Sequence, residues 1–261
     1  MEIECREVSK TFVDARRGRS GGVRALDRVS LKLESREILS IVGPSGCGKS
    51  TLLRILAGLI EPDSGTVIRS AEGDGRPSNA LVFQEHALFP WMTVVDNVAF
   101  GLRMRGEGRR ESAAKAGELL DRIGLAGFAR RHPHELSVGM RQRVNLARAF
   151  LVDPKVLLLD EPFAALDAQT RLLLTGELLA SFERSHKSVI YVTHDIEEAI
   201  LVGDRVLVLS GRPARIIDEI PVPLARPRDM VVRADPRIGE IEARIWRQLE
   251  SEVKRGLEAT G

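Results

Sequence analysis

The sequence predicts an α/β fold with a mixed, largely parallel core sheet, an antiparallel β layer at the N-terminus and an inserted helical segment. Short apolar runs alternate with segments of helical periodicity, which is typical of parallel strands joined by helices. Residues 2–12 and 23–35 instead alternate apolar and polar side chains, as half-buried strands do. From residue 93 to about 153 the periodicity is helical throughout. The 261 residues, 43% of them hydrophobic, suffice to bury a core.

The N-terminal layer is expected to be two strands joined by a flexible loop. In the second strand Val29, Leu31 and Leu33 alternate with polar residues. The loop is predicted at residues 16–22, which are rich in Arg, Gly and Ser. Phe12 ends the first strand, and its ring could either stack on an adenine base or pack in the core.

An apolar strand, a glycine-rich loop and a helix come next. Residues 38–42 are the apolar run, residues 43–51 fit the pattern G-x-x-x-x-G-K-[ST], and residues 50–59 carry apolar side chains at helical spacing. This is the context of a phosphate-binding loop, in which glycines let backbone N–H groups turn inward and the helix start adds partial positive charge.

The phosphate-binding loop supplies most of the candidate nucleotide ligands. Lys49 is expected to reach the β- and γ-phosphates, and the Ser50 hydroxyl is expected to bind Mg²⁺. The residues assigned to the loop are Gly43, Pro44, Ser45, Gly46, Cys47, Gly48, Lys49, Ser50 and Thr51.

The remaining elements follow the same two periodicities. Further strands are predicted at 66–68, 80–83, 156–159, 188–193 and 205–209, with a long helix at 168–185. Within the helical insert, Ser137 is placed as an N-cap. From Arg237 onward apolar residues share one helical face opposite charges of both signs, which predicts a helix that caps the core.

Residues 86–91 are rich in aromatic side chains, whereas the whole chain is only 4% aromatic. Such a cluster beside a helix start is either part of a local core or a docking surface. The residues alone favour neither.

Composition argues against several classes of protein. Lys plus Arg number 39 and Asp plus Glu 37, mixed along the chain, so no single-sign tract indicates a nucleic-acid partner. Cys5 and Cys47 lack metal-ligand spacing and favour a reducing compartment. No apolar run approaches the roughly 18 residues of a membrane span, and the charged start lacks a signal-peptide pattern. We expect a cytoplasmic chain that another subunit recruits if it works at a membrane.

Polar side chains stand at the ends of the apolar strands, where one site could collect them. Asp160 is expected to hold Mg²⁺ directly or through water. Glu161 could take the proton from, or orient, the water that attacks the γ-phosphate. Gln84 could bridge Mg²⁺ and that water, and His194 could hold the γ-phosphate or the base in position.

Residues 136–143, Leu-Ser-Val-Gly-Met-Arg-Gln-Arg, resemble the signature motif of ATP-binding-cassette (ABC) ATPases. The other family motifs stand in order over about residues 2–230: Gln84 as the Q-loop, 159–162 as Walker B, 165–167 as the D-loop and His194 as the switch histidine. The resemblance implies a P-loop NTPase fold over 1–235, with a helical subdomain at about 87–153 and a helical tail at 236–261.

The same resemblance implies a homodimer. Each ATP is expected between the phosphate loop of one subunit and the signature segment of the other, which adds Ser137, Gly139 and Asp167 to the nucleotide-binding residues. A helix start at Ser137 would supply the second anion site.

Two residues depart from the usual Leu-Ser-Gly-Gly-Gln signature. Met140 replaces Gln, which is a mild change, and Val138 replaces Gly. A β-branched residue disfavours positive φ and adds bulk near the nucleotide, so we expect looser contacts and slower turnover, with hydrolysis retained.

Residues 84–94, 96–98, 160–167 and 210–228 are further similar to the ATPase subunits of nitrate, sulfonate and taurine importers. This similarity implies an integral membrane permease as partner, a solute-binding protein as an indirect partner, and a place on the cytoplasmic face of the membrane. It favours docking for the aromatic cluster. Two alternatives stay open: a regulatory subunit with impaired hydrolysis, and a soluble ABC ATPase not tied to transport.

Overall fold

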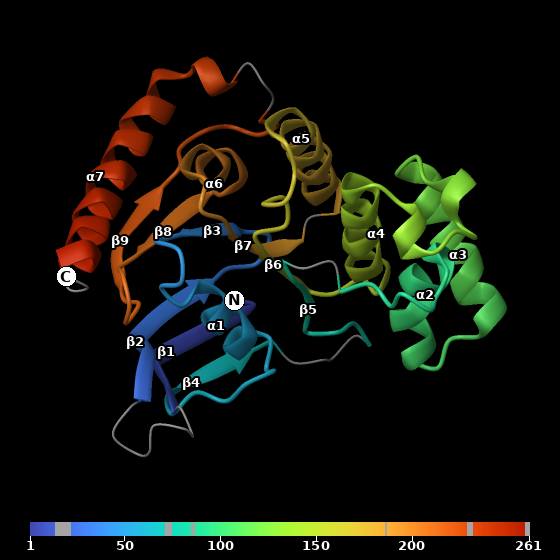
Figure 1. The fold of residues 1–261 in the computed structure, drawn as a ribbon, viewed down its shortest axis with the longest axis horizontal. Coiled ribbons are helices and arrows are strands. Elements are labelled where there is room, and N and C mark those ends of the chain that lie inside the picture. The colour runs from blue at the N-terminus through green and yellow to red at the C-terminus, as the bar shows by residue number, and fades with distance from the viewer. Residues whose placement is uncertain (14–21, 71–74, 85–86, 186, 229–231, 259–261) are drawn as a thin grey trace.

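The computed structural model describes residues 1–13, 22–70, 75–84, 87–185, 187–228 and 232–258 (Figure 1). Most of the predicted loop at 16–22, and residue 86 of the aromatic-rich segment, lie outside the described residues. The strands are β1 (Ile3–Val13), β2 (Gly22–Leu33), β3 (Ile38–Val42), β4 (Ser64–Arg69), β5 (Asn79–Val82), β6 (Val156–Asp160), β7 (Ser188–Val192), β8 (Arg205–Leu209) and β9 (Ile216–Pro221).

The strands form two sheets, as predicted. A three-stranded antiparallel sheet has the order β2-β1-β4, and a six-stranded sheet has the order β5-β6-β7-β3-β8-β9. Neighbouring strands from β5 to β8 are parallel, and only β9 pairs antiparallel with β8. The carboxyl ends of β3, β6 and β7 therefore meet at one edge of the sheet.

Helices cover the large sheet and form a separate group beside it (Figure 1). The helices are α1 (Lys49–Leu56), α2 (Val94–Met104), α3 (Arg109–Arg122), α4 (Val138–Leu151), α5 (Ala168–Ser185), α6 (Ile196–Val202) and α7 (Pro236–Glu258), with short 3-10 turns η1 (Ala126–Phe128), η2 (Pro133–Glu135) and η3 (Val232–Ala234). Among the described residues, no helix combines the length and apolar character that a membrane span requires.

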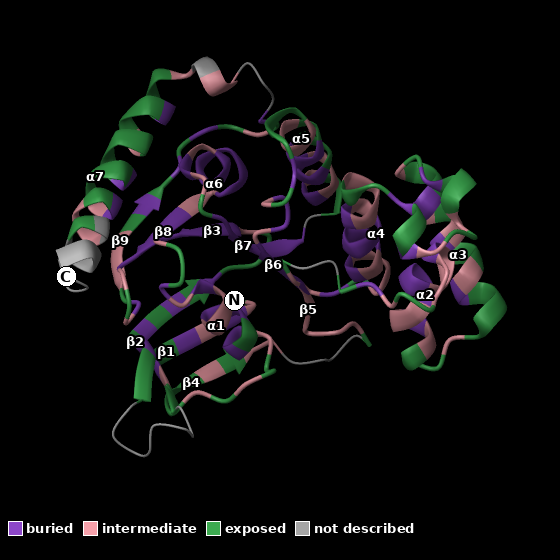
Figure 2. Cartoon of the chain, viewed as in Figure 1, coloured by how far each residue is buried: buried purple, intermediate pink, exposed green. Residues whose placement is uncertain are grey.

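The parallel strands are buried on both faces, as continuous apolar runs predict (Figure 2). Leu39 and Ile41 of β3 pack with α1 and the antiparallel sheet, whereas Ile38 packs with α5. Successive side chains of β3 therefore point to opposite faces of the sheet and pack in different layers of the core.

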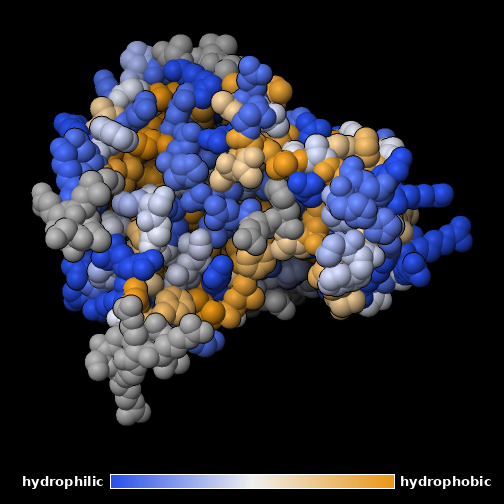
Figure 3. Space-filling view, in the orientation of Figure 1, coloured by the Kyte–Doolittle hydropathy of each residue, from blue (hydrophilic) through white to orange (hydrophobic). Residues whose placement is uncertain are grey.

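The helical segment has a hydrophobic cluster of its own, drawn from residues between Leu88 and Ala147. The predicted core-capping role of the last helix is confirmed, since Ile245 and Leu249 of α7 are buried against α6 and β8. Seen as in Figure 1, the left and right margins of the molecule are mostly hydrophilic, and hydrophobic residues show toward the middle of the view (Figure 3).

One helix end differs from the prediction. The helix predicted to run to residue 59, with Leu59 on the same face as Leu52 and Ile55, is shorter: α1 ends at Leu56, and Leu59 is 57% exposed. Gly58 adopts a left-handed φ of 77°, and the N–H groups of Gly58 and Leu59 bond back to Ile55 and Arg54. This glycine stop satisfies the last carbonyls and turns the chain out of the helix.

Candidate active site

The phosphate loop leaves the carboxyl end of β3 and enters α1 at Lys49. Gly46 and Gly48 have φ values of 70° and 135°, and a Cβ on Gly48 would lie 2.7 Å from the Ala25 carbonyl oxygen. Only glycine fits such a position. No side chain caps α1, so the N–H groups of its first turn face the loop and are available to an anion.

Lys49 lies across its own loop. The side chain is buried, and its ammonium donates to the carbonyl oxygens of Gly43 at 2.8 Å and Pro44 at 3.1 Å. The same nitrogen lies 3.8 Å from a carboxylate oxygen of Glu161. The ammonium is therefore already held at the loop, beside the carboxylate predicted to act on the attacking water.

Asp160 ends β6 next to this loop and is only 4% exposed. Burial raises the pKa of Asp160, although a hydrogen bond with Ser50 opposes the rise. Its Oδ1 atom is buried and finds no hydrogen-bond partner among the described residues. A buried carboxylate oxygen without a partner, next to a hydroxyl, is a donor set that suits a hard cation such as Mg²⁺.

Glu161 and His194 form a direct contact. The Nδ1 atom of His194 lies 2.8 Å from Oε2 of Glu161. Glu161 adopts a left-handed φ of 45°, and its N–H donates to the Val192 carbonyl at 2.9 Å. A non-glycine residue in this region is strained, and such strain gathers at functional sites. The strained backbone directs the carboxylate toward His194.

A buried carboxylate that sequence reasoning missed supports the loop of His194. Glu198 accepts hydrogen bonds from the hydroxyls of Tyr191 at 2.8 Å, Thr175 at 3.4 Å and Thr193. Burial raises the pKa of Glu198. The Asp195 side chain caps the Glu198 N–H at 3.0 Å. The Asp-x-x-Glu spacing of a helix start was the available signal, but it predicts a helix cap and no buried network.

Arg171 of α5 also reaches this loop. Its guanidinium lies 3.6 Å from an Asp195 oxygen and donates to the Leu166 carbonyl at 3.1 Å. It therefore connects the predicted D-loop with the residue that follows His194.

Gln84 is exposed two residues after the end of β5, and no hydrogen bond joins its side chain to another residue that the structure describes. The structure thus brings together Lys49, Ser50, Asp160, Glu161 and His194, and it leaves Gln84 apart from their contacts.

The signature segment begins α4. Ser137 is the N-cap, as predicted, and its hydroxyl accepts from the Met140 N–H at 3.3 Å. Ser137 is exposed and Gly139 half-buried, and neither is hydrogen-bonded to the phosphate loop within the described ranges. Asp167 likewise caps α5, and the bond from the Thr170 N–H lowers the pKa of Asp167.

The premise that position 138 needs a positive φ is wrong. Val138 is the first residue of α4 and has helical backbone geometry, so the position requires no positive φ. Its side chain is 38% exposed at the helix start. Bulk toward a neighbouring molecule is the remaining effect of the branched side chain.

Phe12 does not pack in the core. It is 45% exposed at the end of β1, paired with Val23 of β2, and the Lys10 ammonium lies 6.0 Å from its ring centroid. Of the two interpretations given for this ring, stacking on a base remains.

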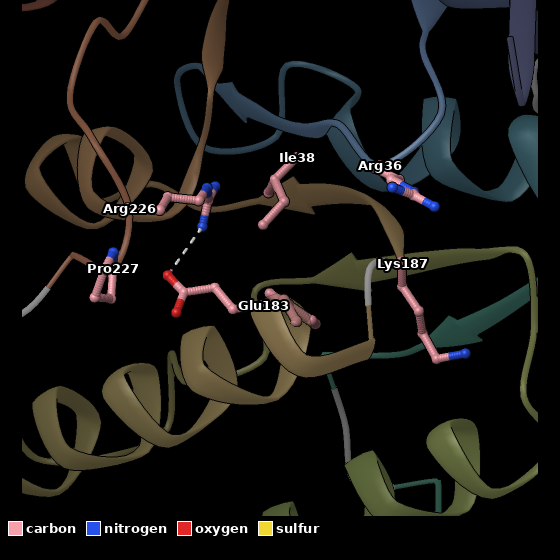
Figure 4. Close-up of a pocket in the computed structure, with 7 residues that line it drawn as sticks. Arg36, Ile38, Glu183, Lys187, Arg226 and Pro227 are labelled. Atoms are coloured by element: carbon pink, nitrogen blue, oxygen red, sulfur yellow. Dashed lines mark ion pairs between the residues drawn. The ribbon is translucent and has the colours of Figure 1, made fainter.

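A separate hollow of about 320 Å³ lies at the amino-terminal end of the parallel strands, opposite the phosphate loop (Figure 4). It is lined by Ile38, the first residue of β3, whereas the phosphate loop follows the last residue of that strand. In this hollow Arg226 points toward Glu183, and the two form an ion pair at 3.9 Å. This hollow is not part of the nucleotide site.

The chain is similar to ATP-binding proteins of importers. An aliphatic sulfonates import ATP-binding protein of Burkholderia lata is 49% identical over 219 residues, covering 83% of this chain and 78% of the relative. A taurine import ATP-binding protein of Burkholderia thailandensis is 43% identical and covers 90% and 94%. A nitrate import ATP-binding protein of Synechocystis is 43% identical and covers 86% and 84%.

A solved structure and a family model identify the same fold and family. The dimeric, post-hydrolysis structure of the ATP-binding cassette MJ0796 bound to ADP and Pi matches with a TM-score of 0.73 and 31% identity, covering 85% of this chain and all of that one. The family model described as ABC transporter matches residues 26–164. This protein belongs to the ABC transporter family and is one of its ATP-binding ATPase subunits.

Proposed function

We propose that the chain is the ATP-hydrolysing subunit of an ABC importer for a small anionic solute such as nitrate, sulfonate or taurine. The observation that carries the hydrolytic role is the contact of Glu161 with His194, 2.8 Å apart and next to the phosphate loop. The solute class is supported by the printed names of the sulfonate, taurine and nitrate relatives.

The chemistry we propose centres on Glu161. Its carboxylate takes a proton from the water whose oxygen attacks the γ-phosphorus, while the bond from that phosphorus to the leaving oxygen of ADP breaks. Because an ionised carboxylate only accepts hydrogen bonds, Nδ1 of His194 carries the proton in their contact. That leaves Nε2 of His194 available to the γ-phosphate.

Lys49, Ser50 and Asp160 hold the other side of the substrate. Lys49 exchanges the carbonyls of its own loop for phosphate oxygens. Ser50 and the unpartnered Oδ1 of Asp160 would hold Mg²⁺, and Gln84 would approach it only after moving from its exposed position. When bound, the metal neutralises charge on the phosphate oxygens. Phe12 would contact the adenine ring.

We further propose that two copies close around ATP. The exposed Ser137, Gly139 and Asp167 would meet the nucleotide held by the phosphate loop of the other copy. The dimeric MJ0796 structure supports this arrangement by similarity. In this scheme residues 1–235 are the ATP-binding domain, with the helical subdomain at about 87–153, and residues 236–261 are a helical tail.

The aromatic cluster is the proposed docking surface for a membrane permease. Phe89 packs against Phe100 at a centroid distance of 4.6 Å and lies 5.7 Å below the Arg148 guanidinium, so it belongs to the helical segment. Trp91 remains 71% exposed. An exposed Trp on a rigid base suits burial by a partner helix. This partner would hold the subunit at the cytoplasmic face of the membrane and link it to a solute-binding protein.

ATPase activity of the wild type beside Glu161→Gln tests the hydrolytic role. We expect the wild type to hydrolyse ATP, and Glu161→Gln to bind ATP but to lose nearly all turnover. Hydrolysis absent from both proteins would favour a regulatory subunit. Glu118→Gln on the exposed side of α3 is the matched control and should keep normal turnover.

Transport is tested separately. Affinity purification from membranes should recover an integral membrane partner with the wild type, and Trp91→Ala should reduce that recovery without changing basal ATPase activity. Recovery of soluble partners only would refute the transport role. Solute uptake by the reconstituted complex, measured with nitrate, a sulfonate and taurine in turn, would then decide among the three.

A further inference from the structure

Residues 210–215 follow β8 and contact the phosphate loop, β2 and α7. The Arg212 guanidinium donates to the Gly46 carbonyl oxygen through Nη2 at 2.6 Å and Nε at 3.1 Å. The Gly211 N–H donates to a Glu252 carboxylate oxygen of α7 at 2.8 Å. The segment therefore joins the C-terminal helix to the phosphate loop.

The same segment is fixed to the antiparallel sheet. The Ala214 N–H donates to the Ala25 carbonyl at 2.9 Å, and the Asp27 N–H donates to the Ala214 carbonyl at 3.0 Å. The side chain of Asp27 is buried and pairs with Arg215. These contacts place Arg212 on a rigid support.

Gly46 is the point at which the loop can change shape most easily. It has a left-handed φ of 70° in a turn closed by the bond from the Cys47 N–H to the Pro44 carbonyl at 3.2 Å. A glycine peptide rotates more freely than any other. Two hydrogen bonds from a charged donor hold the Gly46 carbonyl, and with it the peptide unit that ends at Cys47.

We propose that Arg212 is a positioning residue for the phosphate loop, and that Glu252 of α7 helps to hold it there. The inference rests on the proposed binding of ATP at this loop. Arg212 acts through Gly46, because its Nη2 and Nε atoms are both engaged by that carbonyl. The C-terminal helix thereby influences nucleotide affinity, a role that extends beyond capping the core.

The test compares full-length wild type with Arg212→Leu and Arg212→Lys. Dissociation constants for fluorescent analogues of ATP and ADP are measured, together with steady-state ATPase activity. Loss of two hydrogen bonds to a charged donor should raise both dissociation constants by about tenfold. Arg212→Lys should restore part of the affinity, and kcat at saturating ATP should stay within about twofold of wild type. Arg247→Leu, on the exposed face of α7, should change nothing.

Equal effects on ATP and ADP are expected because the loop holds phosphates that both nucleotides carry. Unchanged dissociation constants would overturn the proposal. So would a loss confined to ATP, since it would mean that Arg212 contacts the γ-phosphate directly.

Glu252→Ala tests the contribution of α7, and it also serves if Arg212→Leu fails to fold. We expect both dissociation constants to rise by about twofold to threefold, less than for Arg212→Leu because Arg212 itself remains. No rise would refute the part assigned to α7. A wild type that binds ATP without hydrolysing it would refute the proposed function, while the binding comparison would still decide the role of Arg212.

Discussion

Without ligands, Asp160→Asn should be more stable than wild type. With Mg·ATP bound, it should be less stable than wild type. Burial raises the pKa of Asp160, which means that the fold disfavours its ionised form. One carboxylate oxygen has no hydrogen-bond partner among the described residues. Asn keeps the shape and an oxygen that accepts from Ser50, but it removes the buried charge and the proposed ligand for Mg²⁺.

The size of the effect follows from the burial of this group. A buried charged oxygen that lacks a hydrogen-bond partner costs at least about 1–3 kcal/mol, and the unpaired amide of Asn offsets part of the gain from removing it. We expect Asp160→Asn to gain about 1 kcal/mol, or about 2–4 °C in Tm for a chain of this size. Mg·ATP at roughly 100 times its Kd should add about 2.7 kcal/mol to the wild type and much less to the variant.

Thermal unfolding in EDTA and in excess Mg·ATP measures both effects. The order of the two melting temperatures should reverse between these conditions. Asp121→Asn, an exposed position on α3, controls for the change in net charge and should follow wild type in both. A variant that melts below wild type in EDTA, or that gains as much as wild type from Mg·ATP, would refute the reasoning.

Three further predictions concern residues around the site. Val138→Gly should leave turnover within about twofold of wild type, because no backbone strain is relieved. It should lower the free energy of unfolding by about 0.5–1 kcal/mol, because glycine weakens the start of α4. A severalfold faster turnover would contradict this. Because burial raises the pKa of Glu198 above 4.5, its contribution to stability is full below pH 4.5 and is lost as pH rises toward the folded-state value. The free energy of unfolding of wild type relative to Glu198→Gln should therefore fall over that interval in denaturant titrations, and a constant difference would contradict the assignment. Arg171→Leu should lower kcat and leave the dissociation constant for ATP unchanged, because it removes the ion pair that holds Asp195 beside His194. Arg171→Lys should recover part of kcat. Equal kcat values in wild type and both variants would exclude a role of Arg171 in positioning His194.

Much of the fold could be predicted because its strongest signals are local. Each central parallel strand is a continuous apolar run, and burial on both faces follows from that pattern. β9 was missed because Ile216–Pro221 mixes apolar and acidic residues and lies half-buried at the end of the sheet, where β8 is its one neighbour among the described strands. The error at Leu59 has a local cause as well: the glycine at residue 58 was a stop signal that apolar spacing alone did not register.

The residues of the candidate site also divide into those with a local sequence signal and those without one. Lys49, Asp160, Glu161 and His194 were predictable because each stands at the end of an apolar strand or in a motif of fixed spacing. Arg212 lies in a segment that resembles the importer subunits, but its contact with the loop was not predictable, because it lies 166 residues from the carbonyl that it contacts. No periodicity or short motif encodes such a pair, and only the folded chain brings them together.

The two halves of the proposed ATP sandwich are prepared to different degrees within one chain. The phosphate-loop half is built from buried groups, Lys49 and Asp160 among them, and Arg212 holds it from outside. The signature half is an exposed helix start whose cap is the single bond at Ser137. A helix start binds anions. The signature half can therefore bind the other copy mainly through a phosphate that the loop of that copy already holds. We therefore expect closure of the dimer to follow occupancy of the loop, so that any residue that tunes loop affinity also tunes how often the two copies close.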